Sequence, residues 1–421
     1  MSLLIKNVLL NGEITSVYIE GNLISEIGKK KEADIVINGD GKALLPGLVN
    51  CHTHAAMTLF RSYADDMKLQ EWLETKIWPA ESKLTPEDVY WGTKLACLEM
   101  IKSGTTCFND MYFFMDSAAK AVQDMGLRAV LSEGFIDMGD KNLGEENIKK
   151  AKEVTKKIAS LRSSRIIPAW GPHAIYTVSS DSLKILKNLS DETGYLLHMH
   201  LSETQLEVKD CRTTHGKSPV NYLHDIGFLN DRCVFAHGVW LESSEVPILA
   251  SYGAKVVNNP ISNMKLAVGK AMPYRELLQA GIAMALGTDG AASNNNLDMF
   301  QTLKFASLIQ KFSTDNQTIA TANEIWDLAT FGGANALGFK AGKIEEGWLA
   351  DLILVDLNKT YMIPNHNLLS NLVYAASGDC VDSVICDGKI LMKNRKVEGE
   401  EEIIEKASVK ARDLIMRASN D

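Results

Sequence analysis

The sequence predicts an α/β fold: a (β/α)₈ TIM barrel with a small β-sandwich domain assembled from both ends of the chain. Three observations support this prediction. The middle of the chain alternates apolar and helical segments, the two ends share a β-rich pattern, and polar side chains capable of chemistry stand where the apolar segments end. Near-continuous apolar strands that alternate with helices are typical of a parallel sheet covered on both faces.

Eight apolar segments in the middle of the chain are the predicted barrel strands. They read ALLPGLVNCH, TTCFND, RAVLSE, RIIPAWGPH, GYLLHMHLSE, CVFAHGVW, KVVNNP and IAMALGTDG. Helical stretches separate them, for example residues 84–104 and 180–194. Eight strands with helical crossovers are the number that closes a parallel barrel.

Both ends of the chain have the pattern of short strands punctuated by Gly and Asn, as β-turns require. We therefore predict three segments. Residues 1–47 form the first part of the β-sandwich domain, residues 48–344 form the barrel, and residues 345–421 form the second part of the β-sandwich domain with a C-terminal helix.

Composition and charge limit the possible partners. The 44 basic and 53 acidic residues give a net charge of −9, which disfavours a nucleic-acid partner because a phosphate backbone would be repelled. Seven cysteines without a C-x-x-C pair suggest reduced thiols. The sequence has no signal-peptide pattern and no apolar run of membrane-spanning length. We expect a cytoplasmic enzyme with a small-molecule substrate, no membrane partner and a homo-oligomeric assembly.

A candidate metal centre is built from three histidines and one aspartate. His52 and His54 stand two positions apart at the end of the first predicted strand, so their side chains leave the same face. His200 ends the fifth strand and Asp289 ends the eighth. Barrel enzymes place their chemistry at these carboxyl ends. A nitrogen-rich set with one carboxylate suits Zn²⁺, with Fe²⁺ as the alternative.

Two more polar residues end neighbouring strands. His237, in AHGVW, is either a fifth metal ligand or a base beside the bound water, and the second interpretation is favoured. Glu203 lies three residues beyond His200, where it can face a substrate and carry protons. Binuclear relatives need a bridging ligand, often a modified lysine, near the end of strand four. Since the segment from Trp170 to His173 has no lysine, we expect one metal ion per subunit.

The segments PGLVNCHTH, HMHLSET, AHGVW, NPISNMKL and LGTDGAASNN resemble the amidohydrolase superfamily. Within it, nearly the whole chain resembles the methylthioadenosine/S-adenosylhomocysteine deaminase family, including its 5′-deoxyadenosine deaminase members. The resemblance implies hydrolytic deamination of the 6-amino group of an adenosine-type nucleoside, with release of ammonia. The alternative is a hydrolase of triazines or of other cyclic amidines or amides, since such enzymes carry similar motifs.

Carried over residue by residue, the resemblance implies a role for each matching residue. The metal ligands are His52, His54, His200 and Asp289; the catalytic residues are Glu203, His237 and Asp289; and the substrate contacts are Glu81, His173, Glu203 and Asp289. His237 and Asp289 would orient the attacking water and accept its proton. Glu203 would protonate the ring nitrogen next to the reacting carbon, and Glu81 would hold the ribose hydroxyls.

The sequence departs from the family at the end of strand three. Members that act on S-adenosylhomocysteine tend to carry an arginine there, whereas Glu133 stands at the expected position and would repel the carboxylate of the homocysteine tail. Arg128 begins the same strand and is expected at the opposite end of the barrel. Small, uncharged 5′ groups are therefore the expected preference.

Several residues near the predicted site have a simpler interpretation. His198 shares a strand face with His200 but lies one layer deeper, so we interpret it as structural. Asp110 is either a partner of a metal-bound imidazole or a capping residue. Trp72 and Trp78 are either a substrate lid or core or interface aromatics.

Overall fold

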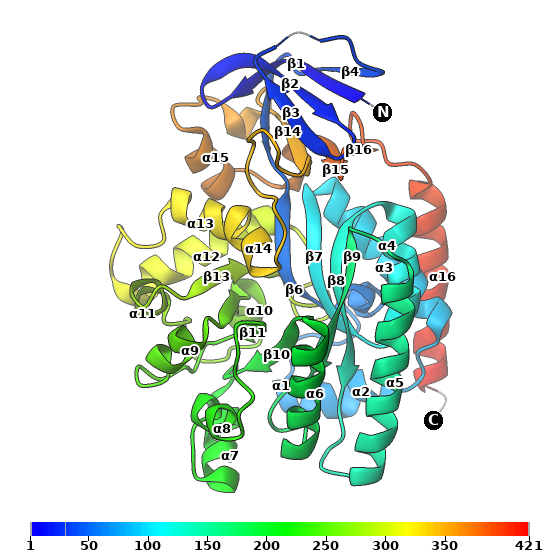
Figure 1. The fold of residues 1–421 in the computed structure, drawn as a ribbon, viewed down its shortest axis with the longest axis vertical. Coiled ribbons are helices and arrows are strands. Elements are labelled where there is room, and N and C mark those ends of the chain that lie inside the picture. The colour runs from blue at the N-terminus through cyan, green and yellow to red at the C-terminus, as the bar shows by residue number, and fades with distance from the viewer. Residues whose placement is uncertain (1, 30, 420–421) are drawn as a thin grey trace.

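The computed structural model describes residues 2–29 and 31–419, and its elements form a barrel with a smaller sheet above it (Figure 1). The barrel strands run in the order β13-β12-β11-β10-β9-β8-β7-β6, and every neighbouring pair is parallel. They are β6 (Leu48–Thr53), β7 (Thr105–Tyr112), β8 (Arg128–Phe135), β9 (Ile166–Pro172), β10 (Leu197–Leu201), β11 (Cys233–His237), β12 (Lys255–Asn258) and β13 (Ala283–Leu286). Each lies within one of the eight predicted segments or overlaps it. The predicted fold class is confirmed.

The ring of strands closes between β13 and β6. The backbone N–H of Asp289, just beyond β13, donates a hydrogen bond of 2.9 Å to the carbonyl of His52 in β6. This closure joins the first and last barrel strands, which are more than two hundred positions apart in the sequence. It also brings the two strand ends that carry the predicted metal ligands into direct contact.

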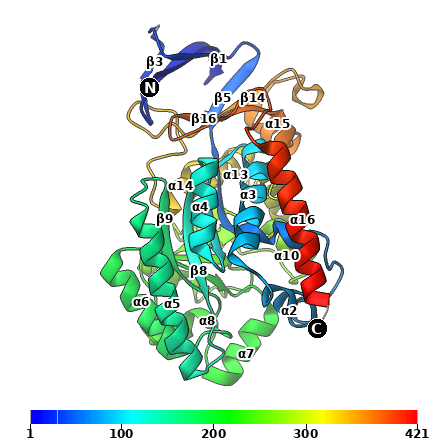
Figure 2. The same ribbon diagram turned by 90° about the vertical axis from the view of Figure 1, so that its right-hand side faces the viewer.

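Helices cover the outside of the barrel (Figures 1 and 2). They are α3 (Pro86–Lys102), α4 (Met115–Met125), α5 (Lys141–Ser160), α6 (Ser180–Thr193), α7 (Gln205–His215), α8 (Pro219–Asp225), α9 (Val246–Tyr252), α10 (Pro260–Lys265), α11 (Tyr274–Gln279), α12 (Met299–Thr314), α13 (Ala322–Leu328) and α14 (Phe331–Ala336). Hydrogen bonds to nearby side chains mark where several of these helices begin. The side chain of Thr85 accepts a hydrogen bond from the N–H of Asp88, the Asp88 carboxylate bonds back, and Pro86 opens α3.

A long connection separates β6 from α3. It contains η1 (Ala55–Phe60), α1 (Leu69–Trp72), the π-helical turn η2 (Leu73–Ile77) and α2 (Trp78–Glu81). Long ordered connections in compact domains commonly carry binding residues. Trp72 and Trp78, for which a lid role and a packing role are both open, lie in this segment.

The two chain ends share one sheet, as predicted for the accessory domain. Its strand order is β16-β15-β14-β5-β1-β2-β3, with β4 paired to β1. The strands are β1 (Ser2–Leu10), β2 (Glu13–Glu20), β3 (Leu23–Ile27), β4 (Ile35–Asn38), β5 (Lys42–Pro46), β14 (Leu352–Asp356), β15 (Val381–Cys386) and β16 (Lys389–Met392). The first predicted barrel segment is therefore two strands, because β5 belongs to this sheet and β6 to the barrel. The predicted limits of the three segments remain predictions.

The last part of the chain fastens the accessory sheet to the barrel. It includes η3 (Thr360–Met362), α15 (Leu368–Tyr374), η4 (Gly378–Cys380) and α16 (Glu400–Ser419), which descends beside α3 (Figure 2).

Arg128, at the start of β8, is buried and forms ion pairs with Asp351 at 2.7 Å and Asp387 at 3.0 Å. Arg128 thus lies at the end of the barrel opposite the predicted chemistry, as expected. Among the described residues, no helix has the length and apolar character needed to cross a membrane.

Candidate active site and metal centre

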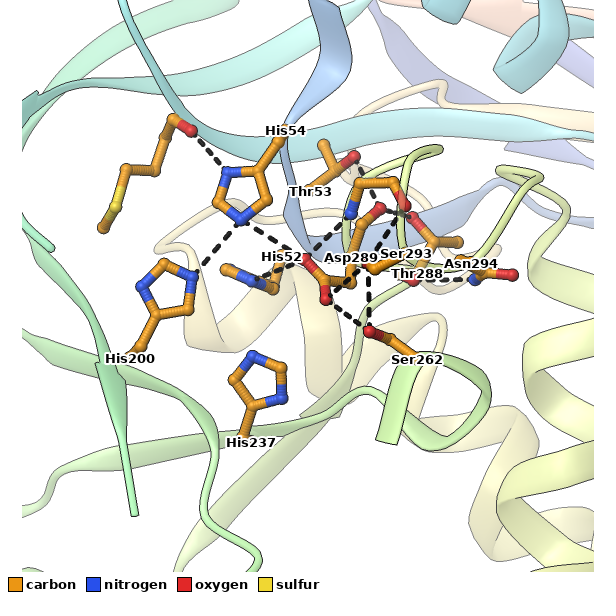
Figure 3. Close-up of polar contacts among 12 residues, drawn as sticks. His52, Thr53, His54, His200, His237, Ser262, Thr288, Asp289, Ser293 and Asn294 are labelled. Atoms are coloured by element: carbon orange, nitrogen blue, oxygen red, sulfur yellow. Dashed lines mark hydrogen bonds and ion pairs between the residues drawn. The ribbon is translucent and has the colours of Figure 1, made fainter. Parts of the chain in front are cut away.

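The carboxyl end of β6 presents two imidazoles to one carboxylate. The Nε2 atoms of His52 and His54 lie 3.3 Å and 3.2 Å from Oδ1 of Asp289. His200, at the end of β10, places its Nε2 atom 3.2 Å from the Nε2 atom of His54. Figure 3 shows these side chains turned toward one another. The four predicted metal ligands therefore meet at one point.

Two groups of ligand atoms have the spacing needed to hold a cation. One group is His52, His54 and His200, and the other is His52, His237 and Asp289; within each group the ligand atoms lie within 4.8 Å of one another. His237 is thus close enough to act as a ligand, and both interpretations of its role remain open.

In two of the imidazoles, the hydrogen bond of Nδ1 determines which ring nitrogen carries the proton. Nδ1 of His54 donates to the carbonyl of Met111 at 2.6 Å, and Nδ1 of His200 donates to the carbonyl of His173 at 2.8 Å. A carbonyl can only accept, so in the neutral rings each Nε2 is a bare lone pair. Two lone pairs facing each other at 3.2 Å repel unless a proton or a metal ion lies between them.

One more atom favours a metal ion at this point. Nε2 of His52 is buried and has no hydrogen-bond partner among the residues that the structure describes. Buried polar atoms are normally satisfied, so an unpaired nitrogen facing a carboxylate suggests a ligand. The set of imidazole nitrogens with a carboxylate fits Zn²⁺, and imidazoles whose second nitrogen is held by a carbonyl are typical of zinc sites.

Two serines that the sequence analysis missed hold the carboxylate of Asp289. Ser262 and Ser293 donate to its Oδ2 at 2.5 Å and 2.9 Å, and the N–H of Gly290 donates to Oδ1 at 2.8 Å. Burial raises the pKa of Asp289, but the close contacts of its Oδ1 with the imidazoles of His52 and His54 outweigh burial and hold this pKa well below its usual range. The carboxylate is therefore ionised and fixed in direction. Both serines lie in the quoted motifs NPISNMKL and LGTDGAASNN, which could have signalled them.

The backbone is strained where the strands deliver their side chains. Ser202, His237 and Asp289 have positive φ angles of 51°, 73° and 64°. Such angles are uncommon outside glycine and persist only where the surroundings enforce them. The surroundings are closely packed. A Cβ atom placed on Gly287 would stand only 2.9 Å from the Cβ atom of His52.

Glu203 and His237 form the predicted catalytic pair beside this cluster. Oε2 of Glu203 lies 3.8 Å from Nε2 of His237, and Nδ1 of His237 is held 2.8 Å from Oδ1 of Asn263. Because an amide oxygen accepts, Nδ1 carries the proton of the neutral His237 ring and Nε2 is free to accept a hydrogen bond. Burial raises the pKa of Glu203. A carboxyl group with a raised pKa is suited to carrying protons near neutral pH.

Glu81 and His173, the two implied substrate contacts, lie on opposite parts of the wall. Oε1 of Glu81 accepts a hydrogen bond of 2.7 Å from the hydroxyl of Tyr112, and burial raises the pKa of Glu81 to about 7. Burial lowers the pKa of His173 to about 3, so this ring is neutral. Its Nδ1 lies 2.8 Å from Oγ1 of Thr177.

The predicted site residues other than His52 border one cavity. The polar residues His54, Glu81, His173, His200, Glu203, His237 and Asp289 line it together with an apolar wall that contains Leu69, Trp72, Leu73, Ile77 and Trp78. Trp72 is also part of the main core, with its Nε1 donating to the carbonyl of Ala64. The two tryptophans therefore belong to the cavity wall, and for Trp72 the core interpretation holds as well.

The structure corrects the expected placement of Glu133. Glu133 is absent from the described lining of this cavity and is only 4% exposed, so its carboxylate does not face the substrate there. Its two oxygens accept hydrogen bonds from the N–H groups of Phe114 and Met115 at the start of α4, and its Oε1 lies 2.9 Å from Nζ of Lys150. The position is thus a helix cap paired with a lysine. The sequence pattern could not reveal Lys150, because it comes from the neighbouring helix α5.

Asp110 has the simpler of its two expected roles. Its Oδ1 accepts a hydrogen bond of 2.8 Å from the N–H of Ala55, the first residue of η1. This bond makes Asp110 a capping residue. The carbonyl of Met111, rather than the Asp110 carboxylate, holds the His54 ring.

The chain is similar over nearly its full length to known proteins. The chain is 52% identical over 400 residues to 5-methylthioadenosine/S-adenosylhomocysteine deaminase 1 of Archaeoglobus fulgidus, covering 94% of each chain. It is 49% identical over 424 residues to 5′-deoxyadenosine deaminase of Methanoregula boonei, covering 99% of this chain and 96% of the relative. An adenosine deaminase from Xanthomonas campestris with bound zinc superposes with a TM-score of 0.92 at 34% identity, covering 100% of this chain and 99% of the other.

The alternative reading as a triazine hydrolase finds only distant support. The atrazine chlorohydrolase of Arthrobacter aurescens has a TM-score of 0.86, but it is 22% identical, with coverage of 97% of this chain and 100% of the other. Such a likeness shows the shared fold alone. By contrast, the model of the amidohydrolase family matches residues 43–391, which include every predicted site residue. The chain belongs to the amidohydrolase family.

Proposed function

We propose that this enzyme hydrolyses the 6-amino group of an adenosine-type nucleoside, giving the inosine analogue and ammonia, with one Zn²⁺ ion per subunit and Fe²⁺ as the alternative metal. The observation that carries this proposal is the meeting of His52, His54, His200 and Asp289 at one point, beside a cavity that Glu203 also lines. The names of the two deaminase relatives at about 50% identity support the substrate class.

The four ligands would hold the metal with three imidazoles and the ionised carboxylate of Asp289; backbone carbonyls orient the rings of His54 and His200. A bound divalent ion supplies Lewis acidity, which brings the pKa of a coordinated water toward neutrality. Asp289 accepts the proton of the attacking water, and His237 orients that water through its free Nε2 atom. Ser262 and Ser293 keep the Asp289 carboxylate aimed during this step.

Glu203 carries out a second proton transfer, separate from the one at Asp289. Its buried carboxyl group donates to the ring nitrogen next to C6, which makes that carbon more electrophilic. Water then adds to C6, protons pass to the exocyclic amine, and the C–N bond breaks to release ammonia. General acid–base assistance of this kind contributes roughly 10²–10⁴-fold to the rate. The raised pKa of Glu203 suits the group to deliver a proton near neutral pH.

Glu81 positions the nucleoside. We assign its carboxylate to the vicinal ribose hydroxyls, with the Tyr112 hydroxyl fixing its direction at 2.7 Å. Charge-assisted hydrogen bonds from two hydroxyls fix both distance and angle. His173 lies beside His200 in the cavity wall, where its neutral ring can contact the base.

A second cavity supports a preference among 5′ groups. It shares Trp78, Glu81, Phe113 and Ile136 with the first cavity, and the remaining lining includes Leu84, Phe114, Met138 and Lys150. We propose that it receives the 5′ substituent beyond the ribose. Apart from Lys150 the wall near this point is mainly apolar, and the Lys150 ammonium is already paired with Glu133. A small uncharged 5′ group is therefore favoured over a homocysteine tail, whose carboxylate lacks a free cation.

The experiment that tests the proposal is the measurement of kcat/KM for adenosine, 5′-deoxyadenosine, 5′-methylthioadenosine and S-adenosylhomocysteine, with chloride release from triazines as the competing activity. Ammonia from the nucleosides supports the proposal, and triazine turnover without it contradicts the proposal. Glu133→Gln should raise the S-adenosylhomocysteine to 5′-deoxyadenosine ratio, because it frees the Lys150 charge. Lys150→Met is the matched control and should not raise that ratio.

Two further expectations concern the surroundings of the enzyme. All seven cysteines are free and buried, which fits a reducing compartment such as the cytoplasm. We also expect a homo-oligomer. Light scattering after size-exclusion chromatography measures the assembly directly, and a mass of 46.3 kDa would mean a monomer.

A further inference from the structure

His198 is a buried histidine that the proposed reaction does not use. It lies in β10 two positions before His200, with no exposed surface. Its Nε2 atom is 2.8 Å from Nδ1 of His52, whose other nitrogen faces Asp289. The outer nitrogen of His52 therefore contacts a second imidazole, whereas His54 and His200 use backbone carbonyls.

The direction of this hydrogen bond follows from the metal site. A neutral imidazole carries one proton, on one nitrogen only. If Nε2 of His52 binds a metal ion, that proton must lie on Nδ1 and be donated to His198. Nε2 of His198 must then be the bare acceptor, and the single proton of His198 must lie on its own Nδ1.

Ser132 agrees with this direction from the other side. Its Oγ donates its only proton to the carbonyl of Asp110 at 2.8 Å. Toward His198 it therefore offers a lone pair, and Nδ1 of His198 lies 3.5 Å away, at the long end for a hydrogen bond. This series of hydrogen bonds ends at the carbonyl of Asp110, which can only accept. Each donor therefore points in the same direction, from His52 through His198 and Ser132 to that carbonyl.

We propose that His198, supported by Ser132, is a positioning residue that selects the tautomer of His52 able to bind the metal. The proposal rests on the metal site of the proposed function. Without this acceptor, His52 can place its proton on Nε2 and donate it to Asp289, which closes that nitrogen to a cation. His198 thus governs metal affinity without touching the metal or the substrate.

The test compares three variants by their zinc dissociation constants, measured by competition with a chelator. His198→Phe keeps a ring but has no acceptor, and it should weaken zinc binding by about 10- to 100-fold, the usual effect of losing such a partner. His198→Gln places an amide oxygen near the former Nε2 position and should restore most of the affinity. Ser132→Ala removes the second acceptor and should weaken binding by a smaller factor.

A spectroscopic measurement on the unmodified protein tests the proposal independently of whether the variants fold. In histidine-labelled, zinc-loaded enzyme, nitrogen–proton correlations should show the Nδ1–H tautomer for both His52 and His198. A proton on Nε2 of His198, or unchanged zinc affinity in a folded His198→Phe variant, overturns the proposal. If the unmodified protein bound no metal, the proposed metal site itself would fail, which is a distinguishable outcome.

Discussion

The backbone N–H of Glu203 donates a hydrogen bond of 2.8 Å to the carboxylate of Glu207, four residues further along the chain. The other oxygen of Glu207 accepts from the N–H of Ser202 at 2.9 Å. Glu207 is 5% exposed and lies in the first turn of α7. Its two bonds hold the backbone at the strained turn from which the Glu203 side chain enters the cavity.

Glu207→Gln should therefore lower kcat by roughly tenfold, with a smaller effect on KM and with zinc content unchanged. An amide offers one acceptor oxygen in place of two, so one of the two N–H groups loses its partner. Steady-state kinetics with metal analysis measures this effect.

Glu245 provides a matched control for that variant. It is fully buried and accepts hydrogen bonds from the N–H groups of Val220 and Glu242 in the same manner, away from the cavity. Glu245→Gln should reduce thermal stability and leave kcat unchanged. Equal losses of kcat in both variants would show that Glu207 acts only through stability.

Glu203→Gln should retain zinc and lose most of the rate, by roughly 10²–10⁴-fold in kcat. Glutamine is nearly isosteric with glutamate, so the cavity persists, but it cannot transfer protons. Metal analysis and a pH–rate profile are the measurements. An unchanged kcat would remove Glu203 from the mechanism.

Asp289→Ala should abolish turnover and weaken zinc binding. The substitution removes the only carboxylate of the ligand set, and it leaves Ser262 and Ser293 without their acceptor. Ser293→Ala is the milder companion, since Asp289 would keep two of its three donors and should still bind metal. Full activity with one bound metal in Asp289→Ala would refute the ligand assignment.

Glu81→Ala should reduce kcat/KM for nucleosides far more than for free adenine, because the bare base has no ribose hydroxyls to lose. Tyr112→Phe removes only the hydroxyl that holds Glu81 and should have a smaller effect in the same direction. Equal losses for nucleoside and base would argue against a ribose contact.

The pKa of Glu81 gives this contact a pH dependence. Burial raises the pKa to about 7, so below that pH the group is protonated and accepts hydrogen bonds less well. In the free enzyme, kcat/KM for nucleosides should rise as the pH increases through about 7. Glu81→Gln, which cannot ionise, should lose this component of the profile. The sign would be wrong if the native profile fell over that range.

Much of the site could be predicted because strand ends in a parallel barrel converge. His52, His54, His200 and Asp289 each follow an apolar segment, so the fold alone brings them to one rim. No knowledge of side-chain contacts was needed. The same reasoning gave the single-metal expectation from the absence of a lysine in strand four.

Residues that act through hydrogen bonds across the fold escaped prediction. Asn263 and Ser262 lie in α10, whereas their partner His237 ends β11 and their partner Asp289 lies beyond β13, so no sequence spacing connects them. Glu133 was misplaced for a related reason. Its position on β8 was correct, but the direction of its carboxylate depends on the N-terminus of α4 and on Lys150 from α5.

The sheet that unites the two chain ends imposes an order on how this protein can fold as it is made. Leu45 of β5 pairs with Ile353 of β14, roughly 300 positions later in the chain. Strands β1 to β5 therefore wait, with their apolar faces uncovered, until all eight barrel strands have been synthesised. Closing so long a loop is slow, and exposed strands of this kind are prone to aggregate while they wait. Chains arrested before residue 352 should accordingly leave the β1–β5 segment open to proteolysis, and release of about forty further residues, through β16, should protect it.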